Sequence, residues 1–337
     1  MKKQISIFLP AVLLFTAFSL GGAQSVSAAD APWTPGADVQ GVTPSLDDED
    51  EYYFEFTCSP KRYPGLIFVP AFKTAQLTWE TNYDYPISFE SSDPDRITVN
   101  DKGKLTSKEL NPFYPVHISA YVTFPDGEER KVAEITAYSL FTDVVDTTAY
   151  YFMPVYNAVM RNITAGFTDS SGKPTGYFKP NETCTRGQIV TFMYRAYRFA
   201  FPADTSCVAD FKDVKSGAYY YDAVKWAVAM GITTGYTDKN GKPTGKFGPD
   251  DPCTRAQVVT FIYRLLGGLI SPDFSDVPDF KDVKPGAYYY AAVRWAVAMK
   301  ITTGYTGTGK FGPDDPCTRG QVVTFIDRTP YITVIDG

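Results

Sequence analysis

The spacing of hydrophobic and polar positions changes near residue 140. Residues 51–140 contain short runs of β-branched and aromatic side chains, separated by turn signals such as Ser92-Asp93-Pro94-Asp95 and Pro125-Asp126-Gly127. This pattern predicts short strands that pack as a β-sandwich. We expect strands at Tyr52–Phe56, Gly65–Val69, Ala75–Thr81, Ile87–Glu90, Ile97–Val99, Lys104–Thr106, Val116–Phe124 and Lys131–Ala137.

After residue 140 the chain repeats one unit three times. The copies read P-N-E-T-C-T-R-G-Q-I-V-T-F, P-D-D-P-C-T-R-A-Q-V-V-T-F and P-D-D-P-C-T-R-G-Q-V-V-T-F. Earlier in the second copy, Tyr221, Val224, Ala227 and Val228 recur at helical spacing, and Gly231 can end that helix. Such self-similarity predicts one helical unit built three times, each copy packed on its neighbours.

The C-T-R motif predicts the start of a second helix in each unit. Thr254 suits the N-cap and Gln257 completes a capping box. Cys253 and Val258 fall at the two positions of a hydrophobic staple. The same arrangement is expected for Cys184, Thr185, Gln188 and Ile189, and for Cys317, Thr318, Gln321 and Val322. Capping therefore explains every residue of the motif except the arginine.

The arginine of the motif stands where local electrostatics disfavour it. Arg186, Arg255 and Arg319 occupy the first helical position, beside the positive end of the helix dipole. One explanation is a structural salt bridge to a neighbouring unit. The other is an anionic ligand, held jointly by the helix N-terminus and the guanidinium.

The N-terminal residues predict export. Lys2 and Lys3 precede an apolar run and then the small residues of Val26–Ala29, which together indicate a secretory signal peptide over residues 1–29. A membrane anchor is the alternative interpretation. No later stretch is apolar and long enough to span a bilayer, so we expect no membrane partner after cleavage. Residues 30–50 end in an acidic run and are expected to form a solvated linker.

Composition argues against several classes of function. The net charge is −6, and no basic patch is interleaved with aromatic residues, so no nucleic-acid partner is expected. The five cysteines do not have the spacing of a zinc site, and three of them suit small apolar positions. His117, the single histidine, lies on an expected strand and is interpreted as structural. We therefore expect no metal and no cofactor.

The repeats resemble the S-layer homology (SLH) domain. The residues that carry the resemblance are F-K-D-V, Y-Y-Y-D-A-V-K-W-A-V-A-M-G-I-T-T-G-Y and F-G-P-D-D-P-C-T-R-A-Q-V-V-T-F. The resemblance implies a mainly α-helical pseudo-threefold bundle of repeats at 141–200, 209–268 and 278–330. It also implies anchoring to a Gram-positive-type cell wall through a secondary cell wall polymer, often pyruvylated.

The resemblance implies a set of polymer-binding residues. They are Arg186, Arg255, Arg319, Trp226, Trp295, Gly235, Gly304, Asp213 and Asp282. Each non-arginine member also has a structural interpretation: core packing for tryptophan, a turn for glycine and a cap for aspartate. Repeat 1 has Asn157 in place of tryptophan, and Pro154 is expected to interrupt the start of its first helix. This departure predicts two strong sites and a weaker third.

The region 51–140 resembles a bacterial immunoglobulin-like domain of the group 2 type, through T-W-E-T and I-S-F-E-S-S-D-P-D-R-I-T-V-N-D-K-G-K-L-T. The expected fold is thus multidomain, an all-β immunoglobulin-like sandwich followed by the SLH bundle. The expected function is a non-catalytic cell-surface protein on the cell wall. The alternatives are an adhesin or S-layer-associated protein whose immunoglobulin-like domain binds a surface protein or host ligand, and, less favoured, a wall-anchored glycan hydrolase.

Overall fold

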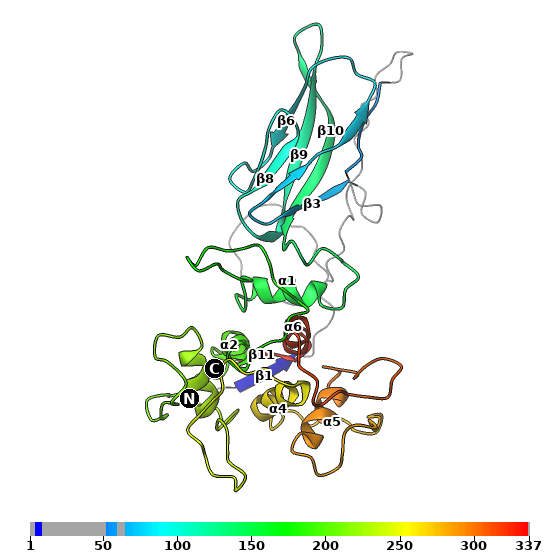
Figure 1. Cartoon of the computed structure of the whole chain (residues 1–337). Helices are drawn as coiled ribbons and strands as arrows, with labels where there is room; N and C mark the ends of the chain where they lie inside the picture. Colours follow the sequence, from blue (N-terminus) through cyan, green and yellow to red (C-terminus); the bar gives the residue numbers. More distant parts are fainter. Residues whose placement is uncertain (1–3, 9–51, 59–64, 336–337) are drawn as a thin grey trace. The chain divides into compact units, whose positions relative to one another are not determined.

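A computed structural model describes residues 4–8, 52–58 and 65–335 of the chain (Figure 1). The chain divides into two compact units. The helical unit comprises Met1–Pro10, Thr148–Thr164 and Lys179–Gly337, and the β-rich unit comprises Ala11–Thr147 and Ala165–Phe178. The expected linker at 30–50 and most of the expected signal peptide at 1–29 lie outside the described residues.

The β-rich unit confirms an all-β region before the repeats. Its strands are β2 (Phe54–Phe56), β3 (Leu66–Pro70), β4 (Thr74–Gln76), β5 (Trp79–Thr81), β6 (Ile87–Ser91), β7 (Ile97–Val99), β8 (Lys104–Ser107), β9 (Asn111–Thr123) and β10 (Glu129–Leu140). They form a four-stranded sheet in the order β3-β10-β9-β6, a three-stranded sheet β4-β8-β7 and a pair β2-β5. One core, including Val69, Leu105 and Ile118, joins the larger sheets.

One expected strand is divided in the structure. The run Ala75–Thr81 forms β4, which pairs with β8, and β5, which pairs with β2. Between them Leu77 is buried, and its amide donates to the Gly103 carbonyl at 2.9 Å. The apolar run therefore supplies strands to two different sheets, which a sequence pattern alone cannot separate.

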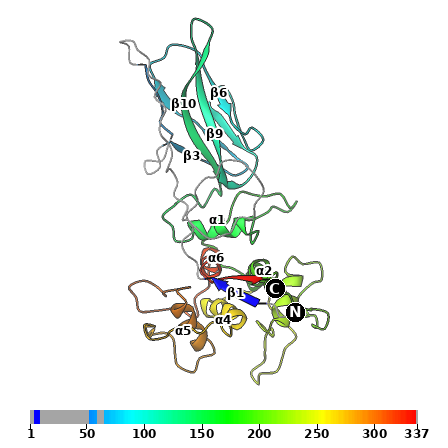
Figure 2. The same ribbon diagram turned by 180° about the vertical axis from the view of Figure 1, so that it is seen from behind.

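The helical unit contains two helices from each repeat. The first helices are α1 (Phe152–Met160), α3 (Tyr221–Ala229) and α5 (Tyr290–Ala298). The second helices are α2 (Arg186–Tyr197), α4 (Arg255–Leu266) and α6 (Arg319–Asp327). Each second helix packs on the first helix of the following repeat: α2 on α3, α4 on α5, and α6 back on α1 (Figures 1 and 2). The ring of three repeats is thereby closed.

A triangle of backbone hydrogen bonds relates the three repeats. The amide of Cys184 donates to the carbonyl of Cys317, that of Cys317 to Cys253, and that of Cys253 to Cys184, over 2.9, 2.8 and 3.2 Å. All three side chains are fully buried. The cysteines of the repeated motif therefore meet at a pseudo-threefold centre.

The expectation that Pro154 interrupts the first helix of repeat 1 is wrong. Pro154 is the third residue of α1, which has nine residues, as do α3 and α5. Proline is tolerated there because the first-turn amides have no acceptor within the helix. As expected, Gly231 follows α3 with a positive φ of 69°.

A further strand pair involves the two ends of the chain. β1 (Gln4–Phe8) pairs antiparallel with β11 (Tyr331–Ile335), as Figure 2 shows. Among the described residues, no helix has both the length and the apolar character needed to cross a bilayer.

Candidate functional site

The predicted capping boxes are present at all three second helices. Thr254 Oγ1 accepts from the Gln257 amide, and Gln257 Oε1 accepts from the Thr254 amide. The boxes of Thr185 with Gln188 and of Thr318 with Gln321 have the same bonds. Sequence reasoning thus located the start of each of these helices correctly.

The remaining first-turn amides are also satisfied, by the turn of the following repeat. The amides of Arg186 and Gly187 donate to the carbonyls of Asp251 and Pro249, at 3.0 and 2.8 Å. Because all of these donors have partners, the expectation that the helix N-terminus helps to hold an anion is wrong for this conformation. Of the two groups expected to hold an anion, the guanidinium is the one to which this finding does not apply.

Each arginine crosses to the next repeat in the ring. We call these contacts the 1–2 seam (Arg186 with Phe247–Asp251), the 2–3 seam (Arg255 with Phe311–Asp315) and the 3–1 seam (Arg319 with Lys179–Glu182). Arg186 Nε donates to the Phe247 carbonyl at 2.9 Å, and Arg255 Nε donates to the Phe311 carbonyl at 2.9 Å.

Aromatic rings surround the guanidinium groups. The Arg186 guanidinium carbon lies 4.7 Å from the centroid of the Tyr236 ring and 4.8 Å from that of Phe247. Arg255 lies 4.6 Å from Tyr305 and 4.9 Å from Phe311. Such cation–π contacts stabilise a desolvated cation by about 2 kcal/mol.

Arg186 and Arg255 are buried, and no carboxylate among the described residues forms an ion pair with them. Arg186 and Arg255 are each 3% exposed. Among the described residues, neither arginine forms an ion pair. This finding argues against a structural salt bridge for these two arginines, and it leaves two buried positive charges that a bound anion could compensate.

The aspartates position the arginines indirectly. Asp213 accepts from the amides of Phe247 and Gly248, both at 2.9 Å, and the Phe247 carbonyl in turn accepts from Arg186. Asp282 does the same for the amides of Phe311 and Gly312. Both carboxylates therefore fix the turn that holds an arginine, a structural role that differs from the expected cap.

The two glycines are required by packing. Gly235 has a φ of 75°, and a Cβ there would lie 2.4 Å from the Phe211 ring and 2.6 Å from the Lys246 carbonyl. Gly304 is enclosed in the same way by Phe280 and Lys310. Both positions therefore require glycine for packing and for a positive φ, which is the turn interpretation.

The expected tryptophan platform is corrected by the burial of both side chains. Trp226 is 2% exposed, its Nε1 donates to the Phe201 carbonyl at 2.9 Å, and its ring packs on Tyr194. Trp295 packs in the same way on Tyr263. Neither indole offers a face to a ligand. Consequently, the absence of tryptophan from repeat 1 does not by itself weaken a site there.

Sequence reasoning missed exposed tyrosines beside each seam. Tyr219 is 61% exposed, and its hydroxyl contacts the side chain of Thr185 within electrostatic reach of Arg319. Tyr288 makes the same contact with Thr254, and Tyr150 makes it with Thr318. The signal in the sequence was a tyrosine pair before each first helix, which repeat 1 retains as Tyr150-Tyr151.

The cysteines of the motif are neutral core residues. Burial raises the pKa of Cys184 and of Cys253 to about 12. Burial also raises the pKa of Cys317 well above its ordinary value. Among the described residues, no group of three possible metal ligands occurs.

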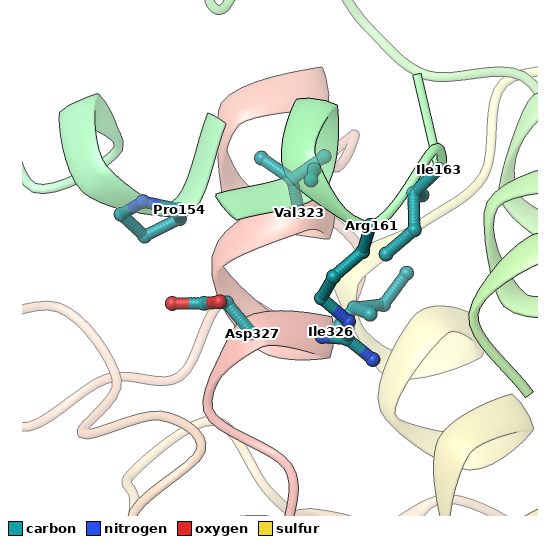
Figure 3. A pocket seen from close by; sticks show the side chains of 7 residues that line it. Pro154, Arg161, Ile163, Val323, Ile326 and Asp327 are labelled. Carbon is teal, nitrogen blue, oxygen red and sulfur yellow. The ribbon is translucent and has the colours of Figure 1, made fainter. Parts of the chain in front are cut away.

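A small hollow lies between α1 and α6 (Figure 3). Its lining is mainly apolar, and Arg161 and Asp327 are its only charged side chains. Asp327 accepts two hydrogen bonds from Asn157 Nδ2, and burial raises its pKa. This polar contact occupies the place that the Tyr–Trp pairs have in the other two helix contacts.

Comparison with known families identifies the repeats. Residues 140–190, 210–259 and 279–323 match the S-layer homology domain. The chain therefore carries three SLH domains.

Two of the known relatives are named as surface proteins, and a third is named as an anchoring protein. A "Cell surface protein" of Thermoanaerobacter kivui is 34% identical over 138 residues, 40% of this chain and 17% of that protein. The "Surface-layer 125 kDa protein" of Lysinibacillus sphaericus is 30% identical over 191 residues, 53% of this chain and 15% of that protein. A "Cellulosome-anchoring protein" of Acetivibrio thermocellus is 28% identical over 161 residues, 47% of this chain and 34% of that protein. The chain thus spans less than a fifth of the first two relatives.

Proposed function

We propose that the three S-layer homology domains anchor this cell-surface chain to the cell wall by binding an anionic secondary cell wall polymer. The burial of Arg186 and Arg255 without an ion pair among the described residues is the observation that carries the proposal. A carboxylate of the polymer, such as a pyruvate ketal, would form charge-assisted hydrogen bonds with a guanidinium.

The exposed tyrosines are suited to the sugar that bears the charge. Tyr150 and Tyr219 present aromatic surface within electrostatic reach of Arg255 and Arg319. Aromatic side chains combine apolar area with a hydroxyl, a combination that fits a sugar ring. Because the arginines are almost fully buried, we propose that these tyrosines move aside as the polymer binds. Several weak sites on one polymer would gain through effective concentration.

Co-sedimentation of the full chain with purified cell walls tests this function. We expect binding to weaken with salt. We also expect weaker binding in the double variant Arg186→Lys with Arg255→Lys, because lysine keeps the charge but cannot donate the paired hydrogen bonds of a guanidinium. Lys239→Gln, at an exposed lysine of repeat 2, is the control. Wall binding that is unaffected by both salt and the arginine changes would contradict the proposal.

We further propose that the β-rich unit is the displayed, immunoglobulin-like module and that the chain is non-catalytic. An aromatic cluster on this unit favours a role in binding a partner: Tyr52 stacks on Tyr83 with centroids 5.0 Å apart, and Phe124 lies 6.0 Å from Tyr83. Release of reducing ends from wall polysaccharide by the purified chain would instead support a wall-anchored hydrolase. Loss of binding to a surface protein in Tyr52→Ser would support an adhesin.

A further inference from the structure

The turn that receives each arginine differs in charge among the three seams. The turns are Gly248-Pro249-Asp250-Asp251, Gly312-Pro313-Asp314-Asp315 and Lys179-Pro180-Asn181-Glu182. Two aspartates against one arginine give a formal charge of −1 in the 1–2 and 2–3 seams. In the 3–1 seam, two cations against one glutamate give +1.

The 3–1 turn holds its helix as the other two turns do. The amide of Arg319 donates to the Glu182 carbonyl at 2.9 Å, and the amide of Gly320 donates to the Pro180 carbonyl at 2.8 Å. The corresponding bonds of Arg186 and Gly187 are 3.0 and 2.8 Å. The 3–1 turn therefore makes the same backbone hydrogen bonds as the other two turns and differs from them in charge, next to the arginine.

Lys179 occupies a backbone position that suits glycine. Its φ is 61°, whereas Gly248 and Gly312 have 70° and 71°. A side chain at such a φ costs about 1 kcal/mol relative to glycine. The lysine is thus present although the backbone conformation disfavours it.

The direction of the Cβ at this position is known from the other seams. A Cβ on Gly248 would lie 2.4 Å from Tyr236 Cε2 and 2.4 Å from Asp251 Oδ2, and the Tyr236 ring lies against Arg186. By the repeat symmetry, the Lys179 side chain leaves the backbone on the arginine side of its own seam. Repeat 1 has Phe167 and Glu182 where repeat 2 has Tyr236 and Asp251.

The lysine is accessible to a ligand. Lys179 Nζ lies 2.8 Å from Glu182 Oε1, and the two side chains are 41% and 54% exposed. An exposed ion pair of this kind contributes about 0–1 kcal/mol, so an incoming anion can replace the glutamate at small cost.

We propose that the 3–1 seam prefers a doubly charged anionic group, with the chemistry of a phosphate monoester, and that Lys179 sets this preference. The proposal rests on the proposed function, since it assumes that the seams bind anionic groups. The 1–2 and 2–3 seams, with two aspartates each, would oppose a second negative charge on the ligand. The three sites of one chain would then bind different substituents of a wall polymer.

Nuclear magnetic resonance titration of the full chain tests the preference at each seam separately. The amides of Gly187, Ala256 and Gly320 report the 1–2, 2–3 and 3–1 seams. The probes are glucose 6-phosphate, inorganic phosphate and a singly charged pyruvate-ketal methyl glycoside. We expect glucose 6-phosphate to bind the 3–1 seam about threefold to fivefold more tightly than the other two, in line with one added exposed charge pair.

Variants identify the residue responsible. Lys179→Gly restores the residue of the other repeats and should fold at least as stably. It should abolish the preference at Gly320 and leave the Gly187 response unchanged. Glu182→Gln should strengthen glucose 6-phosphate binding at Gly320, and Lys246→Ala is the matched loss of charge in repeat 2. Inorganic phosphate that binds as tightly as glucose 6-phosphate would assign the preference to the phosphate alone and support the proposal.

Two results would overturn the inference, and they differ in what they say of the proposed function. If the ketal glycoside shifts Gly187 and Ala256 while Gly320 shows no phosphate preference, the inference fails and the proposed function stands. If none of the three amides responds to any probe, both fail. An unchanged preference in Lys179→Gly also contradicts the assignment of Lys179.

Discussion

Asn157 and Asp327, 170 residues apart, close the ring of repeats with a hydrogen-bonded contact: Asn157 Nδ2 donates to the two Asp327 carboxylate oxygens at 3.1 and 3.3 Å. In the other two helix contacts, Tyr194 packs on Trp226 and Tyr263 packs on Trp295. The α1–α6 contact is therefore the polar member of the pseudo-threefold set.

Replacing the polar pair by the aromatic pair should stabilise the closure. We expect Asn157→Trp with Asp327→Tyr to unfold at higher denaturant concentration than either single variant, with a coupling energy of about 1 kcal/mol. Chemical denaturation of the four members of this double-mutant cycle measures the coupling. Additive effects of the two changes would show that the pairs are not equivalent.

Asp327 should make stability depend on pH. Burial raises its pKa above the ordinary value of 3.8, so the folded state binds its proton more strongly than the unfolded chain does. Its contribution favours folding below 3.8 and is lost as the pH rises through the raised pKa. We expect Asp327→Asn to be more stable than the parent at neutral pH, on the order of 1 kcal/mol, with a smaller difference in acid. Equal differences at both pH values in denaturant titrations would contradict this sign.

The three central cysteines should be inert in the folded protein. With pKa values near 12, Cys184 and Cys253 remain protonated in mildly alkaline solution, where the exposed Cys207 reacts. Thiol labelling followed by peptide mass spectrometry should modify Cys207 in the native state and the central cysteines only after unfolding. Native-state labelling of Cys253 would mean that the ring opens.

Trp226 should matter for stability more than for binding. We expect Trp226→Phe to lower the free energy of unfolding by about 1–3 kcal/mol, since the buried indole loses volume and its hydrogen bond to Phe201. At temperatures where the variant is folded, its wall binding should equal that of the parent. Tyr219→Ser is the complementary variant, expected to weaken binding with little effect on unfolding. A loss of binding in folded Trp226→Phe would restore the stacking interpretation.

The sequence predicted the elements of the repeats well because local rules determine them. Thr254 and Gln257 specify a helix start through bonds that both lie within one turn. By contrast, the pairing of Asn157 with Asp327 and the contact of Arg186 with Tyr236 join different repeats, and no local pattern reveals which repeat faces which. For the same reason, the sequence left both core packing and ligand stacking open for Trp226. The division of Ala75–Thr81 between two sheets likewise depends on strand pairing at long range.

The central claim is that the seam arginines hold negative groups of a wall polymer, and calorimetric titration with purified secondary cell wall polymer tests it most directly. The polymer is titrated into the full chain before and after mild acid removal of its ketal carboxylates, alongside Arg186→Lys with Arg255→Lys. We predict heat of binding with the intact polymer, a loss of roughly tenfold or more in affinity without the carboxylates, and a comparable loss in the variant. Equal affinity for both forms of the polymer, in parent and variant alike, would contradict the account.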